Sequence, residues 1–215
     1  MSLFDLFTKK QSLPKRNLNE IKNGCRILFI DDLKFAIVDR LKNQDGWKNT
    51  LWIKDLDSIS QTELLDAHIV LVDVQGVGKK MHCPDEGLGL IVAIKEKYPQ
   101  KKVIMYSGES QGKIETFHKA WNVADHSLKK SATQYEFNNI IEKFAKEAFC
   151  LENCITRIKS VLYNEYAISM NEQEIEKKLN KVFTKGFDEK QVSAVFNIQN
   201  AAAVSEIIQL FLSFN

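Results

Sequence analysis

The chain has 215 residues, 44% of them hydrophobic and 27% charged, which is enough for one ordinary domain and a small second one. Thirty Lys and Arg against 28 Asp and Glu leave a formal charge of +2, so no overall basic field points to nucleic acid. The composition excludes a disordered chain, and no apolar run reaches the roughly 18 residues of a membrane span. Without a secretory signal, and with only four cysteines, we expect a cytoplasmic protein whose thiols stay free.

The positions of glycine and proline divide the chain into regions. Eight of the nine glycines precede residue 113, and all three prolines lie before residue 100. Because these residues break helices and mark turns, a loop-rich mixed domain should come before a helical region. We predict an N-terminal tail over residues 1–22, a mixed domain over 23–148 and an α-helical domain over 149–215.

Short apolar runs alternate with amphipathic stretches in the mixed domain. The pattern predicts strands over 26–30, 51–55, 68–74, 102–108 and about 123–128. It predicts helices over 35–44, 60–67 with Ser60 as its cap, 88–99 and 112–122. Strands that are apolar on both faces and alternate with helices indicate an α/β fold, a doubly wound parallel sheet of five strands. Ligands of such sheets bind beyond the carboxyl ends of the strands.

Polar side chains gather where these predicted strands end: Asp31, Asp32, Asp73, Ser107, Lys129 and Lys130. Two unit charges about 4 Å apart repel by roughly 4 kcal/mol at an effective dielectric of 20, so converging carboxylates need a proton or a cation. Mg²⁺ suits one or two carboxylates together with a phosphoryl oxygen. A nearby hydroxyl and ammonium can bind the other oxygens of a phosphoryl group, which favours Asp73 as a nucleophile that accepts phosphate.

The order of these motifs resembles the receiver domain of bacterial response regulators, over about residues 25–148. ILFIDD is similar to the family's first strand with its acidic pair, and IVLVDV to the strand that bears the phospho-acceptor aspartate. DEGLGLIVAIKEKYPQKKVIMYSG resembles the third helix and fourth strand, and NVADHSLKKSA the segment that carries the family's lysine. The resemblance implies a flavodoxin-like fold and a site for phosphoryl transfer.

The resemblance also implies a role for each site residue. Asp73 would accept the phosphoryl group, and Mg²⁺ would lie among Asp31, Asp32, Asp73 and the backbone carbonyl of Gln75. Ser107 and Lys130, rather than Lys129, would bind the phosphoryl oxygens. The donor would be a sensor histidine kinase, a phosphotransfer protein or a small acyl phosphate. The chain would catalyse its own phosphorylation from such a donor and would have no other enzymatic activity.

The sequence departs from the family's pattern in three places. Ser131 stands where a proline usually follows the lysine, and Ser127 where an aromatic switch residue often sits. The loop over residues 75–86 is longer than usual, and it is either tolerated surface variation or an element for partner recognition or altered dephosphorylation. It brings four further side chains near the site: Lys79, Lys80, His82 and Cys83. A receiver that keeps its acids without being phosphorylated is the alternative interpretation of the whole site.

Apolar residues at heptad spacing follow the mixed domain: Phe137, Ile141, Phe144, Ala148, Leu151, Ile155, Ile158 and Leu162. With no Gly or Pro among them, they predict one extended helix over residues 134–163. The later helices of the same chain could cover this stripe, or a second copy could. We expect the second arrangement, a homodimer through the 134–163 helix.

Three further helices are predicted: residues 171–183 capped by Asn171, residues 188–197 capped by Asp188, and one from about residue 200. The last two faintly resemble a helix-turn-helix, but no Lys or Arg follows Lys190 to neutralise DNA phosphates. This favours an output through contacts with an unidentified protein. The prediction is a phosphorylation-controlled protein of a two-component phosphorelay; the alternatives are a DNA-binding transcription regulator and a phosphorylation-independent scaffold.

Overall fold

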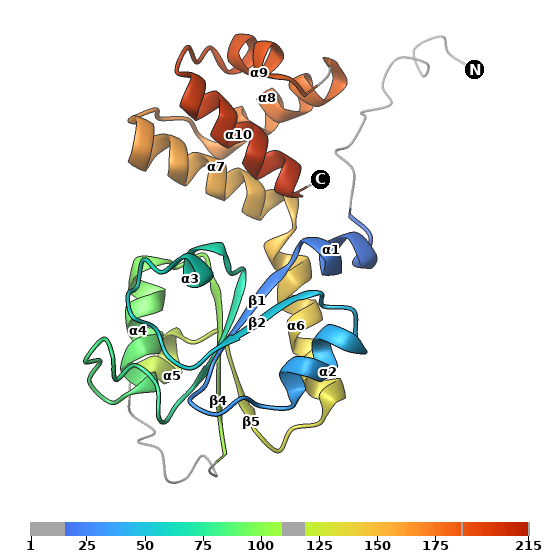
Figure 1. Cartoon of the computed structure of the whole chain (residues 1–215). Coiled ribbons are helices and arrows are strands. Elements are labelled where there is room, and N and C mark those ends of the chain that lie inside the picture. The colour runs from blue at the N-terminus through green and yellow to red at the C-terminus, as the bar shows by residue number, and fades with distance from the viewer. Residues whose placement is uncertain (1–15, 109–118, 186, 215) are drawn as a thin grey trace. The chain divides into compact units, whose positions relative to one another are not determined.

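The computed structural model describes residues 16–108, 119–185 and 187–214 (Figure 1). The chain divides into two compact units, one of Asn17–Ala148 and one that includes Phe149–Asn215. The first unit starts inside the predicted tail over 1–22, because α1 (Leu18–Gly24) is a helix that packs against β2 (Asn49–Ile53) and α6 (Gln134–Ala148). Asn17 caps this helix by accepting from the N–H of Glu20, whose carboxylate accepts from the N–H of Asn17 in return.

Five parallel strands form the sheet of the first unit: β1 (Arg26–Ile30), β2 (Asn49–Ile53), β3 (Ile69–Asp73), β4 (Lys102–Ser107) and β5 (His126–Lys129). Their order is β2-β1-β3-β4-β5. The order reverses between β1 and β3, as in flavodoxin-like sheets. The predicted fold class is confirmed, although β2 begins and ends two residues before the predicted strand over 51–55.

Helices cover both faces of this sheet (Figure 1). α2 (Ile37–Asn43) and α6 (Gln134–Ala148) lie on one face, and α3 (Thr62–Asp66), α4 (Gly87–Lys97) and α5 (Ala120–Val123) on the other. The predicted helix over 112–122 falls mostly outside the described residues. The prediction that Ser60 caps α3 is wrong: α3 begins after Gln61, whose side chain instead accepts from the N–H of Asp57.

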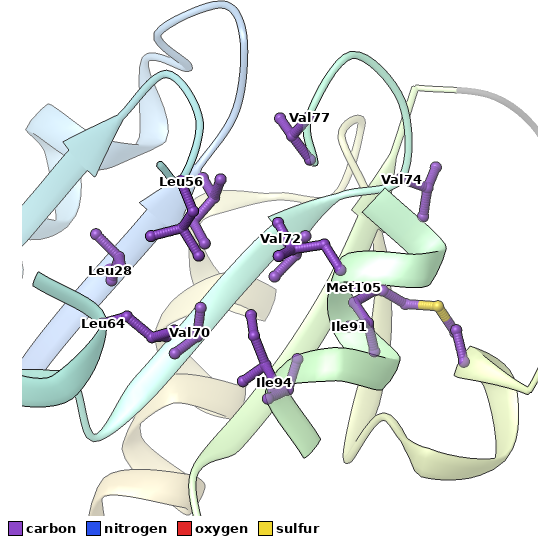
Figure 2. Close-up of a cluster of buried hydrophobic side chains, with 14 of the residues drawn as sticks. Leu28, Leu56, Leu64, Val70, Val72, Val74, Val77, Ile91, Ile94 and Met105 are labelled. Carbon is purple, nitrogen blue, oxygen red and sulfur yellow. The ribbon is translucent and has the colours of Figure 1, made fainter. Parts of the chain in front are cut away.

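The central strands are buried on both faces. Figure 2 shows Val70 and Val72 of β3 among Leu28 of β1 and Ile91 and Ile94 of α4, all of them in one apolar cluster. Full burial of each such side chain contributes about 1.5–3 kcal/mol. These contacts fix the carboxyl ends of β1 and β3, where the predicted site residues lie.

The prediction of one helix over 134–163 is wrong. α6 ends at Ala148, and a separate helix, α7 (Leu151–Tyr166), follows it. The two helices are not continuous because Cys150, between them, has an extended backbone with φ −83° and ψ 154°. Phe137 and Ile141 are buried in the first unit, while Ile158 and Leu162 belong to the apolar core of the second. Two separate cores thus cover the two halves of the stripe, so heptad spacing no longer argues for a homodimer.

The second unit consists of α7, α8 (Glu172–Lys185), α9 (Glu189–Phe196) and α10 (Ala201–Phe214). The predicted caps are confirmed, since Asn171 accepts from the N–H of Glu174 and Asp188 from that of Gln191. One apolar core joins the four helices through residues such as Ile158, Leu179, Phe196 and Phe211. Among the described residues, no helix is long and apolar enough to cross a membrane.

Candidate functional site

Three carboxylates meet at the carboxyl ends of β1 and β3. Asp31 and Asp32 follow β1 directly, and Asp73 is the last residue of β3. Asp31 and Asp73 are buried and Asp32 is partly exposed, and one carboxylate oxygen from each lies within 4.8 Å of the others. The three acids that the sequence placed at strand ends therefore share one site, at the point where the strand order reverses.

Lys130 supplies an ammonium to these carboxylates. Its Nζ lies 2.7 Å from Oδ2 of Asp73 and 3.0 Å from Oδ2 of Asp31. The lysine follows β5, and its backbone N–H donates to the carbonyl of Ser107 at 2.7 Å, which ties it to the end of β4. Lys129 is exposed, so Lys130 is the lysine that reaches the acids.

The charges of the site favour a further cation. Burial raises the pKa of the Asp73 carboxyl and the charge of Asp31 adds to the rise, although the hydrogen bond and charge of Lys130 and the N–H of Gln75 oppose it. Burial alone would lower the pKa of Lys130, but its hydrogen bonds and attraction to Asp73 and Asp31 prevail and raise it. In the part of the chain that the structure describes, three clustered carboxylates thus face the ammonium of Lys130. A divalent cation, which prefers oxygen ligands, would compensate the remaining negative charge of these carboxylates.

Asp31 is held by donors on both of its oxygens. The N–H of Leu33 donates to Oδ1 at 3.0 Å, and the hydroxyl of Tyr106 donates to Oδ2 at 2.9 Å. The indole N–H of Trp52 donates to the backbone carbonyl of Asp31 at 2.9 Å. Sequence reasoning missed Tyr106, because it lies inside a predicted apolar strand and no local pattern marks its hydroxyl as part of the site.

Glycines let the backbone approach the acids closely. A Cβ on Gly76, whose φ is +81°, would lie 2.6 Å from Cγ of Asp32. A Cβ on Gly87, the first residue of α4, would lie 1.9 Å from the carbonyl oxygen of Asp73. Gly87 therefore lets the start of α4 pack on the end of β3, a role that the sequence analysis did not assign.

The loop over 75–86 is tied down by carboxylates away from the cluster. Buried Asp55 accepts from the N–H groups of Gly78 at 2.6 Å and Lys80 at 3.1 Å. The ammonium of Lys80 pairs with Asp57 at 2.7 Å, and Glu86 accepts from the N–H of Gly76 and pairs with Lys79. The two lysines predicted to lie near the site are thus paired with carboxylates outside the acidic cluster.

The remaining predicted residues lie around the cluster. Ser107 is buried at the end of β4, one residue beyond Tyr106, which pairs with Asp73 in the sheet register. A Cβ on neighbouring Gly108 would meet Cδ of Lys130 at an ordinary 3.9 Å. Gln75 is exposed and donates its backbone N–H to Asp73, and its carbonyl as a metal ligand stays a prediction.

No family model matches the chain, and no curated protein matches it. Several solved structures of response regulators do. A response regulator from Thermotoga maritima is 20% identical, with 56% of this chain and 97% of that one covered and a TM-score of 0.42. NtrX from Brucella abortus, in complex with ATP, is 23% identical, with 75% of this chain and 34% of that one covered and a TM-score of 0.45.

RcsB from Salmonella enterica serovar Typhimurium, bound to promoter P1flhDC in the presence of the phosphomimetic BeF₃⁻, is 16% identical. The match covers 88% of this chain and 93% of that one, with a TM-score of 0.46. At these identities and TM-scores the neighbours say nothing further about function, so the geometry of the acidic cluster carries the functional argument.

Proposed function

We propose that this chain is a phosphorylation-controlled signalling protein of the two-component type, in which Asp73 accepts a phosphoryl group. The observation that carries the proposal is the cluster of Asp31, Asp32 and Asp73 with the ammonium of Lys130 against it. A purely structural role would leave several carboxylates crowded at a strand end with their charges only partly compensated, which is costly. A site that binds a cation and a phosphoryl group accounts for that cost.

The proposed chemistry is nucleophilic attack by a carboxylate oxygen of Asp73 on phosphorus. A new P–O bond forms, the bond from phosphorus to the donor breaks, and the donor leaves with that electron pair. The donor is a phosphohistidine of a sensor histidine kinase or a phosphotransfer protein, or a small acyl phosphate. The attack needs the ionised form of Asp73, which Lys130 favours against the effect of burial on its pKa.

The residues present fit Mg²⁺. Asp31, Asp32 and Asp73 would hold it together with the backbone carbonyl of Gln75. When bound, the ion supplies positive charge that offsets the carboxylates and the phosphoryl oxygens. The hydroxyl of Ser107 and the ammonium of Lys130 would donate to the remaining phosphoryl oxygens.

The proposed output is contact between the helical unit and another protein. α10, the candidate reading helix for DNA, places Val204, Ile207 and Phe211 in the core of its own unit. No Lys or Arg follows Lys190, so α10 brings no cation to a DNA phosphate. We place the protein in the cytoplasm, a reducing compartment that suits its four free cysteines.

Labelling with acetyl phosphate tests the proposal. The full chain is incubated with acetyl phosphate in Mg²⁺ or in EDTA, and its intact mass is measured. We expect one phosphoryl group to be added in Mg²⁺ and none in EDTA. Absence of labelling with acetyl phosphate and with phosphohistidine donors would contradict the proposal and favour the phosphorylation-independent scaffold.

A further inference from the structure

A tyrosine hydroxyl reaches the acidic cluster from inside the apolar core. Tyr106 is 1% exposed and lies near the end of β4, opposite Asp73 in the sheet register. Its hydroxyl donates to Oδ2 of Asp31 at 2.9 Å, the same oxygen that Lys130 approaches at 3.0 Å. The phenol thus joins the core to a predicted metal ligand.

Aromatic rings around Tyr106 restrict where its hydroxyl can point. Phe35 stacks on the phenol ring with centroids 6.2 Å apart, and Phe29 of β1 meets its ring edge-on at 5.9 Å. Phe137 of α6 meets it edge-on at 6.4 Å. A ring packed on several sides cannot swing freely, so the hydroxyl stays directed at Asp31.

The contact with Asp31 has a chemical consequence. The hydroxyl is a neutral donor, so it can fix the orientation of the carboxylate without adding a positive charge that would repel a cation. Together with the N–H of Leu33 on Oδ1, it holds both oxygens of Asp31 in place. Hydrogen bonds to ligating side chains of this kind orient the ligands of metal sites.

We propose that Tyr106 is a positioning residue of the cation site, where its hydroxyl holds the carboxylate of Asp31 in the orientation that binds the divalent ion. This inference rests on the proposed function, because it assumes that the acidic cluster binds a cation. It adds a residue that lies outside the cluster and contributes no ligand atom. Its removal should change the affinity for the ion while leaving the packing of the core in place.

Mg²⁺ binding to the full chain, measured by isothermal titration calorimetry, tests the inference in three proteins. Tyr106→Phe removes the hydroxyl and keeps the ring. We expect the Kd for Mg²⁺ to rise about 10-fold, which is the lower end of the effect of losing such a hydrogen bond. Phe144→Leu is the matched control, because Phe144 is buried on α6 but faces the ring of His126. It should lower the melting temperature and leave the Kd unchanged.

The outcomes separate this inference from the proposed function. If the wild type binds Mg²⁺ and Tyr106→Phe binds it with the same Kd, the inference is wrong and the proposed site stands. If Tyr106→Phe and Phe144→Leu weaken binding equally, the effect is one of stability and the inference is again wrong. If the wild type binds no Mg²⁺ at millimolar concentration, both fail.

Discussion

Nζ of Lys130 lies 2.7 Å from Oδ2 of Asp73, although 57 positions separate the two residues in the sequence. Parallel pairing explains the contact, because β3, β4 and β5 are neighbours and their carboxyl ends lie along one edge. The pair is buried on the Asp73 side and about a quarter exposed on the Lys130 side. Several consequences of this arrangement can be measured.

The first concerns the pH dependence of stability. Burial raises the pKa of Asp73 in the folded chain above its value in the unfolded chain. The folded chain therefore loses stability as pH rises from the unfolded pKa to the raised folded pKa, because Asp73 must then ionise while buried. Asp73→Asn removes the buried charge. At pH 8 and without metal, it should raise the melting temperature, because the cost of burying the ionised carboxylate is then removed.

The gain from Asp73→Asn should shrink as pH falls through the raised pKa of Asp73, because the wild-type carboxyl then carries its proton as well. Thermal unfolding followed by circular dichroism from pH 8 to pH 4 measures this. Asp66→Asn is the control, since Asp66 is exposed and pairs with Arg26 at the other end of β1. A melting temperature for Asp73→Asn below that of the wild type at pH 8 would show that the pair with Lys130 outweighs the cost of burial.

A second prediction concerns metal removal. Mg²⁺ at a hundred times its Kd should stabilise the folded chain by about 2.7 kcal/mol, and EDTA should reverse the effect. Asp32→Ala should abolish this stabilisation, because Asp32 is the partly exposed acid of the cluster and its loss spares the core. Asp57→Ala, which removes an exposed carboxylate paired with Lys80, should keep it. Equal stabilisation of all three proteins in a thermal shift assay would place the ion elsewhere.

A third prediction concerns Gly87. In a helix interior, alanine is favoured over glycine by about 1 kcal/mol, and Gly87, the first residue of α4, would gain at most part of this from Gly87→Ala. Its Cβ, however, would lie 1.9 Å from the backbone of Asp73, and we expect a net loss of about 1–3 kcal/mol in urea unfolding. Gly108→Ala is the control, because a Cβ there meets only an ordinary contact. Unchanged or increased stability of Gly87→Ala would mean that α4 can shift away from β3 at little cost.

A fourth prediction tests whether the apolar residues at heptad spacing are buried within one chain or in a homodimer. Ile155 is 5% exposed in the core of the helical unit, so Ile155→Glu should cost at least about 3 kcal/mol and unfold that unit while the sheet remains. Ser160→Glu, on the exposed side of α7, should have little effect. Circular dichroism and light scattering together distinguish the cases. If the wild type is a dimer and Ile155→Glu converts it to folded monomers, the result would support the predicted homodimer.

The sheet and the acids could be predicted from the sequence because both depend on local patterns. Continuous apolar runs identify parallel strands, and the residue after each run lies at a shared edge, which brought Asp31, Asp73 and Lys130 together. Tyr106 and Asp55 could not be assigned in this way. Their hydrogen bonds to Asp31 and to the backbone of Gly78 depend on side-chain packing between segments that are distant in sequence.

The helix break at Cys150 could not be predicted from the sequence for a different reason. Heptad spacing reports which side chains lie on one stripe, but two helices that enter two cores produce the same spacing as one long helix. No Gly or Pro marks the break, and the extended backbone of Cys150 is visible only in the structure. The prediction that Ser60 caps α3 was also wrong. The side chain of Gln61, which accepts from the N–H of Asp57, closes the turn before α3 instead.

The site of phosphorylation is the most direct test of the central claim, that Asp73 accepts a phosphoryl group. Wild type, Asp73→Asn and Asp66→Asn are incubated with acetyl phosphate and Mg²⁺, and intact mass is followed over time. We predict that the wild type and Asp66→Asn each gain one phosphoryl group at similar rates and that Asp73→Asn gains none. Labelling of Asp73→Asn at the wild-type rate would contradict the account, because the phosphoryl group would then be carried by another residue.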